Sequence, residues 1–181
     1  MNRVVILIIV ALVLAGGLIV AYPKYKAFFL PNVPAQLADP YLHIPTGSDF
    51  QQVVQLLHEG GFVQDTSTFK TAAKRMNYIK ANMRGGRFKI EENWSNLDLI
   101  RHLRGGQQAT VKVVLTTERL PENVAAKVAR FIEPDSVTLL QTFTNPEILE
   151  EFGYEAETLM SLFIPNTYDL YWNTSPRQFM E

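Results

Sequence analysis

An uncharged run of eighteen residues, Val4 to Ala21, constrains this chain more than any other feature of its sequence. A membrane-spanning helix needs about 20 apolar residues, with a lower limit near 17, so the run is just long enough. Tyr22 and Tyr25 follow it, and such amphipathic rings favour the headgroup level of a membrane. A core helix of a soluble protein would have a polar face, which this run lacks. We therefore expect residues 1–26 to form a transmembrane anchor with its flanks.

A cleavable signal peptide is the alternative interpretation, because Ala15 and Gly17 form a small-x-small pattern. We favour an uncleaved anchor because the apolar run continues past Gly17. Charge does not fix the orientation, since Arg3 and the amino terminus balance Lys24 and Lys26. A short tail before the helix and a large domain behind it nevertheless fit export of that domain. The chain has no cysteine, so disulfide and thiolate chemistry are not available to it.

Positive and negative charges are segregated along the chain behind a net charge of -1. Residues 70–130 carry thirteen Lys and Arg and five acids, whereas residues 131–181 carry Arg177 and nine acids. Two segments of opposite net charge indicate two surfaces with different functions, or two faces that attract each other. The second interpretation is the simpler. The basic side chains are scattered among apolar ones, so we expect no nucleic acid as a partner.

One pattern occurs twice in the middle of the chain: a short strand, a turn, a polar cap, a helix and a double glycine. The first copy begins at Tyr41 and has Ser48 or Asp49 as its cap. The second begins at Phe88 and has Ser95 as its cap. The apolar stripes of the two helices repeat after 46 residues, and we expect them to pack on one small sheet: Val53, Val54 and Leu57, then Leu99, Ile100 and Leu103.

The other segments complete the expected organisation. Residues 27–40 hold three prolines and predict an extended, Pro-rich stalk between membrane and domain. A helix is expected over Phe69–Met83, ended by a double glycine, and a third strand and helix over residues 111–132. After Pro134 the pattern predicts short helices. The predicted fold class is therefore α+β, with two or three strand-plus-helix units behind an N-terminal transmembrane helix.

The stretch SLFIPNTYDLYWN, residues 161–173, combines four aromatic rings with a proline and two asparagines. Rings beside amide and hydroxyl groups are how a protein surface binds a polar ligand with apolar faces, such as a sugar. The alternative is an edge strand and turn packed against a core. Residue chemistry alone leaves both interpretations open.

The sequence contains no standard catalytic motif and no metal-ligand spacing. Its three histidines lie far apart, so we expect no metal, and we expect no cofactor either. Glycine-rich phosphate-binding motifs and the nucleophile elbow are absent. None of the acidic residues lies within an apolar run, the setting that raises a carboxyl pKa enough for a general acid. We therefore assign no catalytic residue.

Four blocks of the sequence together resemble the endolytic murein transglycosylase family, also called MltG or YceG-like, in the form seen in Bacteroidetes. They are HIPTGSDFQQVVQLLHEGG, RGGRFKIEENWSNLDLIRHLRGG, VKVVLTTERLPENVAAKVA and FIPNTYDLYWNTSPRQFME. The resemblance covers nearly the whole chain. Its most specific parts are the glycine-strand-cap-helix-glycine block and the motif of Pro165, Asn166, Thr167 and Tyr168.

This resemblance implies a single-pass protein of the inner (cytoplasmic) membrane whose domain faces the periplasm. It implies a LysM-like module over residues 41–108, followed by the start of a YceG-like catalytic domain over residues 109–181. The implied activity is cleavage of nascent peptidoglycan between MurNAc and GlcNAc, without water, to leave 1,6-anhydro-MurNAc ends. One glutamate acts first as acid and then as base, unlike the two-carboxylate scheme. The implied partners are glycan strands and peptidoglycan synthases.

The same resemblance places the last motif at the glycan cleft. Its substrate-binding residues are then Phe163, Asn166, Tyr168 and Trp172, which line or support the cleft. A structural interpretation is equally simple: Pro165–Tyr168 form a turn that holds the frame of the cleft.

The sequence departs from the family at its catalytic motif. The family's glutamate belongs to a motif like ASIVEKET, which is absent here. Where many members have a Glu-Gly pair and an aspartate, this sequence has Met160, Ser161 and Asn166. We therefore expect the chain to be the front part of the enzyme, inactive by itself because the catalytic glutamate lies beyond residue 181. The alternative is a non-catalytic, membrane-anchored module that binds peptidoglycan or serves as a scaffold.

Overall fold

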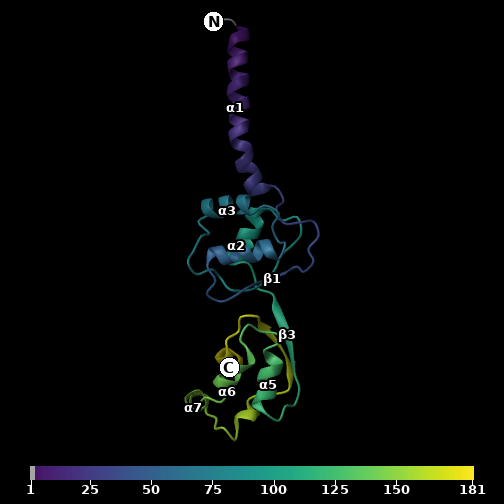
Figure 1. Cartoon of the computed structure of the whole chain (residues 1–181), viewed down its shortest axis with the longest axis vertical. Helices are drawn as coiled ribbons and strands as arrows, with labels where there is room; N and C mark the ends of the chain where they lie inside the picture. The colour runs from purple at the N-terminus through teal and green to yellow at the C-terminus, as the bar shows by residue number, and fades with distance from the viewer. Residues whose placement is uncertain (1–2) are drawn as a thin grey trace. The chain divides into compact units, whose positions relative to one another are not determined.

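The computed structural model describes residues 3–181, which divide into two compact units (Figure 1). The first unit consists of the chain up to Leu42 with residues 49–83 and 90–106. The second unit consists of residues 107–181 with two short segments, 43–48 and 84–89. The chain enters the second unit for the last time at residue 107.

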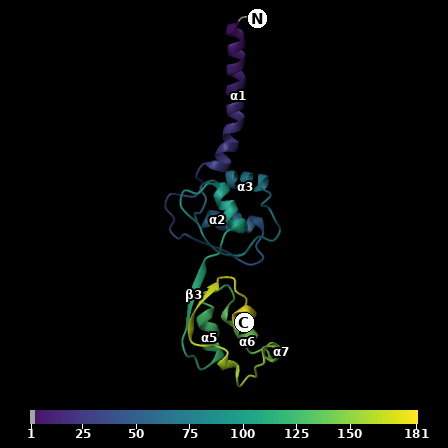
Figure 2. The ribbon, with the colours of Figure 1, turned by 180° about the vertical axis from the view of Figure 1, so that it is seen from behind.

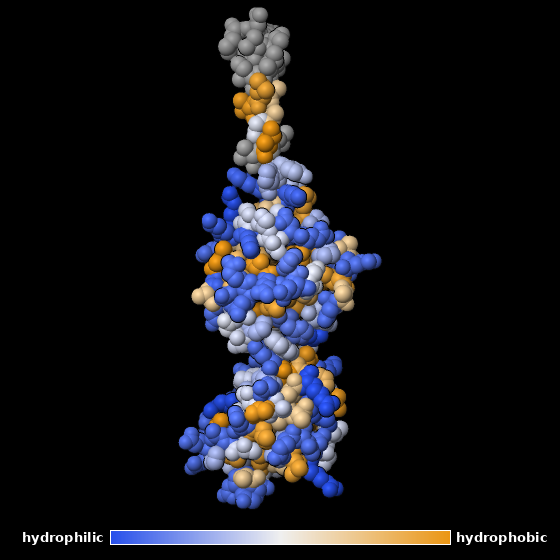
Figure 3. Space-filling view, viewed as in Figure 1, coloured by the Kyte–Doolittle hydropathy of each residue, from blue (hydrophilic) through white to orange (hydrophobic). Residues whose placement is uncertain are grey.

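Helix α1, Arg3–Phe29, begins the first unit. Its stretch Val10–Phe29 is long and apolar enough to cross a membrane, although a signal sequence can have the same length and composition. Large hydrophobic side chains on this helix are exposed, including Leu12 at 67% and Ile19 at 74% (Figure 3). A core helix would bury such side chains, so the exposed surface of α1 fits the expected anchor.

The segment that follows α1 is not the free, extended stalk expected there. Val33 is 1% exposed and Asn32 is 5% exposed. Both backbone amides donate to the Trp94 carbonyl at 3.0 Å, and Pro31 forms an isolated antiparallel bridge with Ser95. The prolines do end the helix, but the amides and side chains between them find partners in the first unit. Helix α1 therefore joins the rest of this unit without a flexible spacer.

The two predicted strand-helix copies are present. Strands β1, Tyr41–Ile44, and β2, Gly86–Lys89, form a two-stranded sheet. Helix α2, Phe50–Glu59, starts at the capping box of Asp49, and helix α4, Asn96–Gly105, starts at that of Ser95. All six residues of the predicted apolar stripes are buried: Val53, Val54, Leu57, Leu99, Ile100 and Leu103.

Helix α3, Thr66–Arg75, is shorter than the predicted helix over Phe69–Met83. It begins after Asp65, whose carboxylate accepts hydrogen bonds from two backbone amides of the first turn at 2.8 and 3.2 Å. It ends at Arg75 with Met76 as its C-cap, because Asn77 has a φ of 53° and takes the left-handed conformation that stops a helix. The prediction failed here because it relied on a double glycine farther along the chain.

Residues 107–181 form a β-ribbon covered by short helices (Figures 1 and 2). The elements are β3 (Thr110–Leu115), α5 (Pro121–Val128), α6 (Ser136–Phe143), α7 (Pro146–Phe152), a 3-10 turn η1 (Leu159–Ser161), β4 (Asn166–Tyr171) and α8 (Pro176–Met180). Strands β3 and β4 pair antiparallel, and β4 is the edge strand that the structural interpretation predicted. Buried side chains of β3, α5 and α6 share one core, which includes Val113, Val124 and Phe143. Helices with two small sheets match the predicted α+β class.

Asn96 is fully buried at the start of α4 and links three segments of the first unit. Its Nδ2 donates to the Ala27 carbonyl near the end of α1 at 2.8 Å, and its Oδ1 accepts from Asn32 Nδ2 at 2.7 Å. Asn32 also donates to the Asp65 carbonyl and accepts from the Asp65 amide. Buried amides need such partners. This network holds the end of α1 against the starts of α3 and α4.

Replacing Leu57 or Leu103 by Ala should destabilise the first unit by roughly 2–5 kcal/mol, because the lost side chain leaves a cavity in the core. Both side chains are fully buried. Denaturant unfolding of the full chain in detergent measures the effect. Leu120→Ala, at a position 56% exposed, is the matched control and should change the free energy of unfolding by less than about 0.5 kcal/mol. Similar small changes at all three positions would contradict a core shared by the two copies.

Candidate functional site

The β3–β4 ribbon positions the predicted C-terminal motif. Its register places Leu115 opposite Asn166 and Val113 opposite Tyr168. Side chains alternate along each strand, so one face of the ribbon packs on the core and the other meets solvent. The solvent face carries Thr110, Lys112, Val114, Thr167, Asp169 and Tyr171, all exposed.

Two of the four predicted substrate-binding residues contribute to the core. Phe163 is 8% exposed, and its ring centroid lies 4.9 Å from that of Phe143. Tyr168 meets Phe179 edge to face at 6.4 Å, and its hydroxyl donates to the Ile164 carbonyl at 2.7 Å. Phe163 is therefore placed to support the frame of a site, and the hydroxyl of Tyr168 already has a partner.

The other two predicted residues lie at opposite ends of β4. Asn166 is exposed, and its Oδ1 accepts from the Thr167 amide at 2.7 Å. Trp172 follows the strand, and its ring meets His43 edge-on at 5.0 Å. A strand of this length separates Asn166 from Trp172 by about 20 Å. The four residues consequently do not converge on one compact site.

A polar groove of about 470 Å³ lies beside the carboxyl end of β4. Its lining includes Gln108, Asp169, Tyr171, Asn173, Thr174 and Gln178. Tyr171 is 49% exposed, and the amide and hydroxyl groups around it can both donate and accept hydrogen bonds. An apolar ring surface among such groups suits a sugar. The aromatic stretch pointed to this end of β4, but no signal in the sequence connected it with Gln108.

Gln108 brings an unsatisfied acceptor to this groove. Its Nε2 donates to the Gly85 carbonyl at 3.1 Å, whereas its Oε1 is shielded from solvent and has no hydrogen-bond partner among the described residues. Gly86 permits the close packing, because a Cβ at that position would clash with the Gln108 amide. A buried acceptor without a donor costs free energy. A water molecule could supply that donor.

Glu118 forms a partly exposed ion pair at the junction of β3 and α5. Lys127 Nζ lies 2.6 Å from Glu118 Oε1, and the Thr116 hydroxyl donates to the same oxygen at 3.0 Å. These hydrogen bonds, that of Lys127 above all, hold the pKa of Glu118 below its usual range. A carboxylate that stays ionised cannot donate a proton at neutral pH, so Glu118 does not have the properties of a general acid.

Residues 3–181 place no carboxyl side chain in the interior of either unit. Burial is what keeps a carboxylic acid protonated near neutral pH for glycosidic cleavage. Within the same described part of the chain, no three His, Asp or Glu side chains gather in a way that could hold a metal ion. The chemistry that this part of the chain offers is therefore recognition by rings, amides and hydroxyls.

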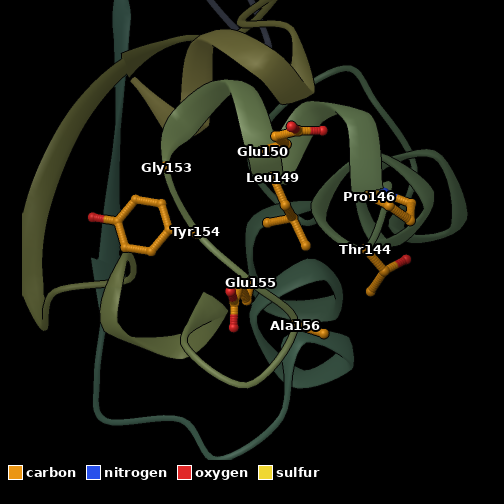
Figure 4. A pocket seen from close by; sticks show the side chains of 8 residues that line it. All are labelled: Thr144, Pro146, Leu149, Glu150, Gly153, Tyr154, Glu155 and Ala156. Carbon is orange, nitrogen blue, oxygen red and sulfur yellow. The ribbon is translucent and has the colours of Figure 1, made fainter.

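A second hollow, of about 480 Å³, lies over α7 and the segment after it (Figure 4). Glu150 and Glu155 lie on either side of Leu149 in this view, and Tyr154 borders the same space. Leu149 is 3% exposed and belongs to the core of the second unit. Each of the two spaces is lined by two carboxylates, Glu150 and Glu155 here and Asp169 and Glu181 beside β4, but only the groove beside β4 also has side-chain amides. We therefore choose the groove beside β4 as the candidate site.

The chain matches known proteins in three kinds of comparison: with family models, with curated sequences and with solved structures. The sequence matches the YceG-like family over residues 42–181. Endolytic murein transglycosylases of two Streptococcus pneumoniae strains are 29% identical over 117 residues, which is 64% of this chain and 21% of theirs. A 2.6 Å crystal structure of a YceG-like protein from Listeria monocytogenes aligns with a TM-score of 0.36 and 16% identity, over 77% of this chain and 51% of that one. The chain spans about a fifth of the length of the curated relatives it matches.

The Glu118 carboxyl should titrate below the usual range for glutamate, because Lys127 and Thr116 stabilise its ionised form. Its contribution to folding stability should be complete above the unfolded-state pKa and should disappear as the pH falls through the lower folded-state pKa. Carbon-detected NMR titration of the side chain measures the midpoint. Lys127→Met should raise the midpoint, whereas Lys112→Met, which removes an exposed lysine elsewhere, should not. A midpoint above the usual range would contradict this account and make Glu118 a candidate acid.

Proposed function

This chain belongs to the YceG-like family, and on that premise we propose that it is part of a membrane-anchored endolytic murein transglycosylase. The observation that carries the proposal is the family match over residues 42–181 behind a helix that could span a membrane. The Streptococcus pneumoniae relatives bear this name, and they match 64% of the chain.

We propose a single-pass arrangement in the inner membrane with both units in the periplasm. The large domain behind a short N-terminal tail supports that orientation. Residues 41–108 would act as a LysM-like module and residues 109–181 as the start of the catalytic domain. Peptidoglycan synthases remain a proposed partner class on the family resemblance alone.

The proposed reaction breaks the glycosidic bond between MurNAc and GlcNAc. A carboxylic acid protonates the leaving oxygen, and the resulting carboxylate then removes the proton from the sugar's own 6-hydroxyl, which closes the 1,6-anhydro ring. This acid must be shielded from water to stay protonated. Because residues 3–181 bury no carboxyl group, the proposal assigns them recognition of the glycan and assigns the acid to a part of the enzyme outside them.

Recognition is proposed to extend along the edge strand. Asn166 and Trp172 mark the two ends of β4, and the groove opens beside Tyr171. A glycan strand is an extended chain of rings, so it could follow the exposed edge of β4 from one end to the other. Phe163 and Tyr168 would then hold the ribbon in place from its core side.

The groove is tested by retention of the full chain on purified glycan strands. Asn173→Ala should weaken binding by about 2- to 10-fold, because one ligand hydrogen bond is worth about 0.5–1.5 kcal/mol. Tyr171→Ala should also weaken it, through loss of the ring surface. The controls are Asn123→Ala and Phe131→Ala, exposed residues of the same unit outside the groove lining. Equal losses in groove and control variants would contradict a site beside β4.

Cleavage is tested separately, by mass spectrometry of nascent strands incubated with the full 181-residue chain. We expect strands to be retained but no 1,6-anhydro-MurNAc ends to appear. A version extended through the family's glutamate motif should produce them. Anhydro ends made by the 181-residue chain would show that one of its exposed or paired carboxyls is the acid. Retention without cleavage by the extended version as well would instead favour the alternative, a non-catalytic binding or scaffold module.

A further inference from the structure

The distance between the apolar run and the first unit is very short. The uncharged run ends at Ala21, and the first residue buried against the unit is Ala27, at 3% exposure. The five helical residues between them rise by about 7.5 Å. The headgroup layer on each side of a bilayer is about 5–7 Å thick. If α1 spans a membrane, the surface of the first unit around α1 therefore begins at the headgroups.

The junction between α1 and the first unit is fixed by buried contacts. Asn96 Nδ2 donates to the Ala27 carbonyl, and both α3 and α4 pack against α1. Figures 1 and 2 agree that α3 lies beside the end of α1 and that α2 lies farther from it. A unit held in this way presents α3, and not a loop of variable position, to the membrane surface.

The outer face of α3 is basic. Phe69, Ala72 and Ala73 of this helix are buried, whereas Lys70 and Lys74 are exposed. Figure 3 shows hydrophilic side chains gathered where α1 meets the unit. Together with Arg75 and the exposed Lys24 and Lys26 of α1, these residues form what we call the α3 surface: Lys24, Lys26, Lys70, Lys74 and Arg75.

Acidic groups near this surface are few and already engaged. Residues 66–90 contain no Asp or Glu. Asp65 caps α3 through two backbone amides, and the Asp98 carboxylate accepts from the Ser95 hydroxyl at 2.6 Å. Glu92 accepts from the Leu37 amide at 3.3 Å. The cations of the α3 surface consequently have no acidic partner among the hydrogen bonds and ion pairs of the described residues.

We propose that the α3 surface binds the headgroups of anionic phospholipids in the membrane that α1 spans. The proposal rests on the membrane anchor of the proposed function and adds a specific lipid contact to it. Basic residues next to a membrane are attracted to anionic lipid, by roughly fivefold in binding for each Lys or Arg at the surface. A protein or glycan partner is less favoured, because the surface is continuous with the interfacial end of α1.

Single-cysteine fluorescence tests the contact in the full chain, which has no cysteine of its own. A fluorophore at Thr71→Cys, an exposed position on α3, is compared with one at Gln55→Cys, an exposed position on α2. The protein is reconstituted into phosphatidylcholine vesicles with or without phosphatidylglycerol, with nitroxide quenchers on the headgroups. Quenching at position 71 should exceed that at position 55, should increase with phosphatidylglycerol, and should weaken as salt is raised.

Charge reversal identifies the residues responsible. Lys70→Glu with Lys74→Glu should remove the dependence on phosphatidylglycerol, whereas Lys89→Glu with Arg130→Glu, two exposed cations outside the α3 surface, should retain it. Unquenched probes on a chain that resists carbonate extraction would overturn the lipid contact and leave the anchor intact. Release of the chain by carbonate would refute the anchor itself. Quenching at position 71 that is equal with and without phosphatidylglycerol would overturn the proposed preference for anionic lipid.

Discussion

The buried amide of Asn96 is the contact on which the arrangement of the first unit depends. It bonds at once to the end of α1 and to Asn32, and through Asn32 to the start of α3. Removing one partner from such a network leaves several buried groups unsatisfied, which costs more than a single hydrogen bond. The same residue opens α4, directly after its cap Ser95. One side chain therefore connects the candidate membrane helix to the folded unit behind it.

Because of this connection, the segment after α1 is not a free stalk. Prolines between residues 27 and 40 suggest a stalk, but Asn32 and Val33 are buried and their amides are bonded. The close join between α1 and the rest of the first unit follows from packing that proline content does not reveal.

The sequence predicted the elements whose signals are local. The caps Asp49 and Ser95 and the stripes that contain Leu57 and Leu103 follow from capping chemistry and helical period, and the structure confirms them. The end of α3 was missed, because a left-handed Asn77 gives a weaker signal than a double glycine. Long-range contacts were also missed. Nothing near Gln108 in the sequence shows that it meets β4 more than 60 residues later.

The aromatic stretch shows the same limit at the candidate site. Its composition favoured polar-ligand recognition, but only the strand register tells which rings face the core. NMR shifts of side-chain amides on addition of soluble glycan fragments test the account most directly. If glycan binds in the groove beside β4, the side-chain amide signals of Gln108 and Asn173 should shift. Those of Gln141 and Asn123, which lie outside the groove lining, should stay unchanged. Shifts confined to backbone amides around Glu150 and Glu155, or no shift at all, would contradict the placement of glycan recognition beside β4.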